Sequence, residues 1–118
     1  MKEITLNNDE ETIIRVVEKA SGLSYSEIKS RKRKENIAIA RNILGVLLRQ
    51  EHYIQFNRIG QIVNRNHASI VYYCKTWQDN YDGWPEYRRL FDKCMNIMQS
   101  QNVITNMQIE IAKRQIDE

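Results

Sequence analysis

The sequence predicts an all-α fold of five or six helices, with a helix-turn-helix and a long central helix. Apolar side chains recur every three or four residues in most segments, which is the spacing of one face of an α-helix. The chain of 118 residues contains a single proline, so little interrupts its helices. This length suits one domain with a modest core, which we expect to span residues 1–118.

Two helices are expected near the N-terminus. The first runs from Asp9 to Ala20; an Asn or Asp among residues 7–9 caps it, and Gly22 follows its end. Ser24 and Glu27 have capping-box spacing, which predicts a short second helix within residues 23–28.

A basic run, Lys-Ser-Arg-Lys-Arg-Lys, occupies residues 29–34 directly before an apolar helix expected over Ile37–Arg49, the predicted central helix. Residues 21–50 hold seven basic and two acidic side chains, whereas residues 1–20 and 76–118 are each net acidic. The run is either a solvated loop or a site for phosphates. Its attachment to a core helix favours phosphates, because such an element can hold the charges in place.

The helix-turn-helix is expected at about residues 56–79. Apolar residues recur at helical spacing before and after the break Asn64-Arg65-Asn66, where an Asn can take a left-handed conformation and Asn66 can cap the second helix. Gly60 predicts that the second helix crosses closely. An exposed second helix with a polar first turn and a cation further along suits a DNA major groove. An ordinary helical hairpin fits the spacing equally well.

Trp84-Pro85 begins a further helix, and a helical extension is expected over about 84–116. Ile97, Ile104 and Ile111 recur every seven residues. This seam either pairs two chains into a homodimer or folds back on the core of its own chain.

No phosphate-cradling glycine loop, metal-ligand cluster or nucleophile–base pair is recognisable, so we predict no enzyme, no cofactor and no metal site. Cys74 and Cys94 lie in apolar helical patterns and are expected to be reduced core residues of a cytoplasmic protein. No apolar run approaches the length of a membrane span, and no signal peptide is recognisable.

Several motifs together resemble the C-terminal DNA-binding domain (domain IV) of the DnaA replication-initiator family, a Trp-repressor-like helix-turn-helix. The resemblance covers about residues 17–80 and rests on LSYSEIKS, the basic run, ENIAIARNILGVLLR, the pair Ile59-Gly60 and the block NHASIV at 66–71. It implies that the basic run and the helix-turn-helix bind a DNA duplex. The family's ATPase region has no room here, so DNA binding without an ATPase domain is expected.

The implied DNA-binding roles are distributed over two segments of the chain. Phosphate contacts are expected from Arg31, Lys32, Arg33, Lys34 and Arg41. Contacts to the DNA backbone near the groove are expected from Arg65 and Ser69, and base-edge contacts from Asn66, His67, Ala68 and Tyr72. Lys75, further along the second helix of the helix-turn-helix, is expected to be one more DNA-binding cation.

The sequence departs from the family pattern mainly at base-reading positions. Asn66 stands where the family usually has Asp, Ala68 where it has Ser or Thr, and Ile39 where a minor-groove Arg is common. Gln55 replaces the usual capping Ser, and the turn before Arg65 is one residue shorter. Asn66 is either a helix cap or a reader of adenine where initiator boxes favour cytosine.

The function expected from the sequence is sequence-specific binding of double-stranded DNA in replication or transcription control, with no membrane partner. The alternative is a helical protein-interaction module that keeps the scaffold without binding DNA and presents the apolar face of residues 97–111.

Overall fold

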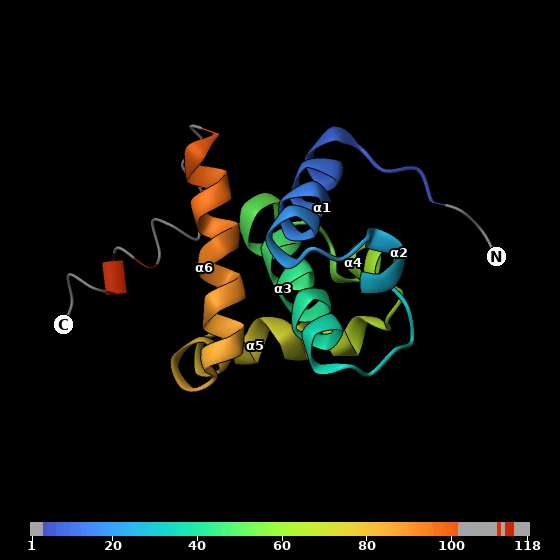
Figure 1. Ribbon diagram of the computed structural model, residues 1–118. Coiled ribbons are helices and arrows are strands. Elements are labelled where there is room, and N and C mark those ends of the chain that lie inside the picture. Colours follow the sequence, from blue (N-terminus) through green and yellow to red (C-terminus); the bar gives the residue numbers. More distant parts are fainter. Residues whose placement is uncertain (1–3, 102–110, 112, 115–118) are drawn as a thin grey trace.

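The computed structural model describes residues 4–101, 111, 113 and 114. Residues 4–101 form six helices and no strands, so the all-α prediction is confirmed (Figure 1). The helices are α1 (Asn8–Ser21), α2 (Tyr25–Ile28), α3 (Glu35–His52), α4 (Phe56–Val63), α5 (His67–Gly83) and α6 (Pro85–Ser100). None of these helices is long and apolar enough to cross a membrane.

Helix α3 lies in the middle of the molecule and packs against all five other helices (Figure 1). Its buried side chains point in every direction around the helix, as expected for a helix that is surrounded by protein. They include Ala40, Ile43, Leu44, Val46, Leu47 and Leu48, all without exposed surface. The predicted central helix is therefore confirmed, although it begins earlier and ends later than residues 37–49.

The two predicted N-terminal helices are confirmed together with their caps. Asn7 caps α1: its side-chain oxygen accepts from the Glu10 N–H at 2.8 Å, and the Glu10 carboxylate accepts from the Asn7 N–H at 3.0 Å. Gly22 follows with a left-handed φ of 74°, which glycine adopts readily. Ser24 and Glu27 form the expected capping box of α2.

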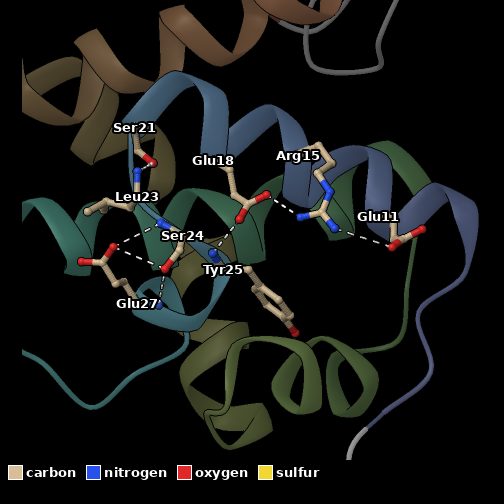
Figure 2. A network of polar contacts seen from close by, with 8 residues as sticks. All are labelled: Glu11, Arg15, Glu18, Ser21, Leu23, Ser24, Tyr25 and Glu27. Carbon is tan, nitrogen blue, oxygen red and sulfur yellow. Dashed lines mark hydrogen bonds and ion pairs between the residues drawn. The ribbon is translucent and has the colours of Figure 1, made fainter.

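Polar contacts join the short helix α2 to its neighbours on both sides. The Glu18 carboxylate of α1 accepts from Arg15 Nη1 at 2.5 Å and from the Tyr25 N–H at 2.7 Å (Figure 2). Tyr25 points away from α1, and its hydroxyl donates to the Ile62 carbonyl of α4 at 2.6 Å (Figure 2). Because the basic run follows α2 directly, the start of that run is anchored to both α1 and α4.

Helix α5 is longer than the sequence predicted. The helix-turn-helix was expected to end at about residue 79, but α5 continues through the polar stretch 79–83 as far as Gly83. Tyr81 supplies the reason: its ring packs edge-on against Trp77 and against Phe91 of α6, so tertiary packing stabilises this last turn. Helix α6 then begins at Pro85, as predicted.

Helix α6 closes the core with Tyr87, Phe91, Cys94, Met95 and Met98. Leu90 and Ile97 of the same helix are only half-buried. Cys94 is buried and Cys74 half-buried, and both are free thiols. Ile104, in the middle of the predicted seam, lies outside the described residues, whereas Ile111 is half-buried against the core of its own chain.

Candidate nucleic-acid interface

Helices α4 and α5 form a helix-turn-helix whose turn passes closely over α4. Asn64 takes the left-handed conformation with φ of 59°, and the Arg65 N–H donates to the Gly60 carbonyl at 2.8 Å. A Cβ atom at Gly60 would overlap the carbonyl oxygen of Arg65. The close approach predicted from this glycine is therefore real, but the turn makes it rather than the body of α5.

Asn66 is the N-cap of α5. Its side-chain oxygen accepts from the Ser69 N–H at 2.9 Å and from the Ser69 hydroxyl at 3.0 Å. Because a carbonyl oxygen has two lone pairs, both are engaged in this cap. The amide N–H₂ of Asn66 donates to none of the described residues. A bidentate contact with adenine would thus require the Asn66 side-chain oxygen to break its hydrogen bonds to Ser69. A contact that uses only the amide N–H₂ as donor would leave those hydrogen bonds intact.

The outward face of α5 presents the side chains expected at base edges. His67, Ala68 and Lys75 are exposed, and Tyr72 is 64% exposed, which is unusual for a large aromatic ring. The opposite face buries Ile70 and Trp77 in the core. The helix is therefore fixed by one side and offers the other to a partner.

The basic loop, defined as residues 29–34, carries four exposed cations: Arg31, Lys32, Arg33 and Lys34. None of them pairs with a carboxylate among the described residues, although arginines elsewhere in the chain do. Their charge is consequently uncompensated within the part of the chain that the structure describes. Such a cluster attracts a polyanion.

Arg41 lies in a different place from the exposed phosphate ligand that was expected. Its side chain is only 5% exposed, because α3 turns it inward beneath the basic loop. Burial lowers the pKa of this guanidinium, and the nearby charge of Arg65 lowers it further. Nε donates to the Ile28 carbonyl at 2.8 Å, and Nη2 donates to those of Ser30 and Lys32 at 2.7 and 3.0 Å. The guanidinium thus binds the backbone of the loop.

Arg65 also contacts the basic loop. Its Nη2 donates to the Ser30 carbonyl at 2.9 Å, while Nη1 donates to the Asn64 carbonyl at 2.7 Å. The Asn64 amide donates to the Lys29 carbonyl at 3.4 Å. The loop and the turn of the helix-turn-helix are therefore tied together. Sequence reasoning missed this connection, because backbone carbonyls accept from any donor and leave no signal in residue identity.

Two family positions are also defined by the structure. Ile39 is 4% exposed and lies in the core, so this position contributes nothing to an outer surface. Gln55 precedes α4 without a side-chain cap, unlike the Ser that the family usually carries there. No group of three or more His, Cys, Asp or Glu side chains that could hold a metal ion occurs among the described residues.

The fold and this surface define a helix-turn-helix domain of the nucleic-acid-binding class. The chain belongs to the family described as bacterial dnaA protein helix-turn-helix, whose model matches residues 10–76. The resemblance seen in the sequence is thereby confirmed. Membership of this family implies DNA binding.

Two curated relatives are chromosomal replication initiator proteins DnaA. The protein from Kosmotoga olearia is 30% identical over 67 residues, which is 57% of this chain and 15% of that protein. The protein from Picosynechococcus sp. is 29% identical over 65 residues, covering 54% of this chain and 14% of its own length. The matched region thus spans about one seventh of these relatives.

Proposed function

We propose that the chain binds double-stranded DNA in a sequence-specific manner, with α5 in the major groove and the basic loop on the phosphates of the same duplex. The observation that carries the proposal is the position of the loop: its four exposed cations have no carboxylate partner among the described residues, and its backbone is tied to the turn that precedes α5. Charge that is left uncompensated beside an exposed recognition helix matches the two needs of duplex recognition, which are phosphate positioning and base readout.

The roles of individual residues follow from their placement. Arg31, Lys32, Arg33 and Lys34 neutralise phosphates from the loop, and Lys75 adds a cation further along α5. Arg65 and Ser69 are half-buried at the turn and the first helical turn, where they reach only the backbone at the edge of the groove. His67, Ala68 and Tyr72 face base edges, and the amide of Asn66 donates to an acceptor on a base.

The replication initiators among the relatives suggest the biological setting. We propose a role in the control of replication or transcription, in which this domain directs the chain to particular chromosomal sites. The Ala68 methyl group favours a nearby thymine methyl, since this position lacks the hydroxyl usual in the family.

Selection of bound duplexes from a random pool tests sequence specificity directly. We expect enrichment of a single motif, together with binding that weakens steeply as salt rises. The same titration on an unselected duplex measures the non-specific component. A pool that shows no enriched motif would contradict specificity. Affinity that ignores salt would contradict duplex binding and favour a protein-interaction module.

Homodimerisation through the C-terminal segment stays a separate proposal. Paired helix-turn-helix units would read two half-sites, and the selected motif would then be palindromic. Light scattering at tens of micromolar chain measures the mass in solution. A monomer at that concentration, with a motif lacking two-fold symmetry, would contradict pairing.

A further inference from the structure

We propose that Arg41 is a positioning residue for DNA binding: it fixes the shape of the basic loop before DNA arrives, with Arg65 as a second anchor on the same carbonyl. This inference rests on the proposed function and concerns how the loop cations are held, rather than which groups touch DNA.

The basic loop contains little hydrogen bonding of its own beyond its first two residues. There the Lys29 N–H donates to the Tyr25 carbonyl at 3.0 Å, and the Ser30 N–H and hydroxyl donate to the Glu27 carbonyl at 3.1 and 2.6 Å. Further on, the Lys32 N–H donates to the Ser30 hydroxyl at 3.3 Å. The next backbone bond along the chain runs from the Ala38 N–H to the Lys34 carbonyl, already in α3. A loop of this kind, rich in like charges, would otherwise populate many conformations.

Arg41, which lies beneath the basic loop, restricts the conformation of its backbone. Its planar guanidinium reaches carbonyls of residues 28, 30 and 32, so the chain must curl around one rigid fork. Arg65 reaches the Ser30 carbonyl from the side of the helix-turn-helix. The Ser30 carbonyl therefore accepts from two arginines, one on α3 and one on the turn, and these two contacts set the loop's place relative to α5.

The charges explain why this arrangement suits an anionic ligand. Arg41 and Arg65 repel each other, and no carboxylate among the described residues pairs with either. Among the described residues, the hydrogen-bond acceptors of both guanidinium groups are backbone carbonyls. A phosphate backbone lying along the loop would add the missing negative charge. A loop ordered beforehand also avoids the entropy that a mobile loop loses on binding.

A lysine cannot replace Arg41 in this role. Lysine keeps the positive charge, but its donors lie on a single nitrogen and cannot span three separated carbonyls. If Arg41 acted only as a charge for phosphates, Arg41→Lys would retain binding. If it acts by positioning, the lysine variant loses binding together with loop order.

The matched control is Arg58, which also makes three hydrogen bonds, to the two Glu10 carboxylate oxygens and the Thr5 carbonyl, and none of these three involves the basic loop. Arg58→Met should lower stability without removing a hydrogen bond of the loop. It therefore reports what a general loss of stability does to DNA affinity.

The experiment compares wild type, Arg41→Lys, Arg41→Met and Arg58→Met by amide hydrogen exchange of the DNA-free protein, thermal unfolding, and titration of the selected duplex. Both Arg41 variants should exchange faster at residues 29–34 and bind roughly 10- to 100-fold more weakly, whereas Arg58→Met should bind as wild type below its melting temperature. If Arg41→Met does not fold, Arg65→Lys removes the outer anchor without disturbing the core. It should show the same effects to a smaller degree.

Wild-type affinity and wild-type loop exchange in Arg41→Lys would overturn the inference and leave the proposed function standing. Equal losses of affinity in Arg41→Met and Arg58→Met would also overturn it, because the effect would then be one of general stability. A wild-type chain that binds no duplex would overturn the proposed function, and with it the positioning role for DNA.

Discussion

Two arginines, Arg58 and Arg41, each hold an irregular segment against the helical core, and they do so with opposite electrostatics. Arg58 binds the buried carboxylate of Glu10 through Nε and Nη2 at 2.8 and 2.7 Å, and it donates to the Thr5 carbonyl at 2.6 Å. Arg41 binds three carbonyls of the chain that leads into the basic loop. The first contact is an ion pair whose charges balance, whereas the second leaves a cation that pairs with no carboxylate among the described residues.

The difference separates a part of the molecule in which positive charges are paired with acids from a part in which they are not. Around α1 and at the α5–α6 corner, arginines pair with neighbouring acids, as Arg15 does with Glu18 and Arg88 with Asp82. Around the basic loop, the described residues offer no acid to any of the exposed cations. Charge balanced internally contributes to folding, and charge left unbalanced is available for binding.

Neutralising the basic loop should have the largest effect on binding. The triple variant Arg31→Ala, Lys32→Ala, Arg33→Ala should flatten the log–log dependence of affinity on salt by up to about 3 units. At 0.1 M salt it should weaken all duplexes alike by roughly 100-fold or more, because counterion release is lost. Fluorescence anisotropy over a salt series measures both quantities.

The matching triple change of paired residues, Arg15→Ala, Arg88→Ala and Arg89→Ala, is the control. It removes the same formal charge at three positions where each arginine pairs with an acidic side chain. A salt slope that is equally reduced in both triple variants would show that net charge, rather than the placement of the loop, governs binding.

Breaking the Arg58–Glu10 pair should have the opposite effect: it should lower the free energy of unfolding and leave DNA affinity unchanged. In Arg58→Met, Glu10 stays buried without its charged partner, which should cost about 2–3 kcal/mol of the free energy of unfolding. Urea unfolding followed by circular dichroism measures this. Arg15→Met, which removes an exposed pair, should change the urea midpoint little. A matching loss in both variants would mean that burial of Glu10 is unimportant.

Changing Asn66 tests whether this residue contacts a base or only caps α5. Asn66→Asp keeps a capping oxygen but replaces the amide donors with acceptors. Selected sites should shift from a base that presents a major-groove acceptor toward cytosine at one position, by a discrimination of roughly 1–3 kcal/mol. Parallel selections with the two proteins measure the shift. Base profiles that coincide would leave Asn66 as a cap alone, with Asn66→Ala costing only about 1 kcal/mol of stability.

Acid should weaken the Arg58 region by a small amount and leave the loop contacts of Arg41 intact. The hydrogen bonds from Arg58 hold the pKa of Glu10 below its ordinary value of 4.5. The ionised pair therefore contributes fully above pH 4.5, and its contribution is lost as the pH falls through the lower pKa of the folded state. The urea midpoints of wild type and Glu10→Gln should converge between pH 7 and about pH 3. A difference in urea midpoint that stays constant over this pH range would exclude titration of Glu10 as its cause.

The sequence by itself determined the helices, because capping and apolar spacing act over three or four residues. Asn7, Ser24, Asn66 and Pro85 begin their helices as expected, and the apolar pattern of residues 37–49 identified the central helix. Local rules failed at the end of α5, where packing of Tyr81 against Trp77 and Phe91 outweighs a polar composition.

Only the tertiary structure decided what each cation does. In the sequence, Arg41 and the exposed Arg33 are equally basic residues close to the same loop. In the structure, the direction in which α3 turns Arg41 places its guanidinium among backbone carbonyls, while Arg33 extends into solvent. Hydrogen bonds to carbonyls depend on where the chain passes and not on which side chains it carries. The division between exposed loop cations and a buried arginine that binds the loop backbone therefore emerges only when the loop, α3 and the turn are assembled.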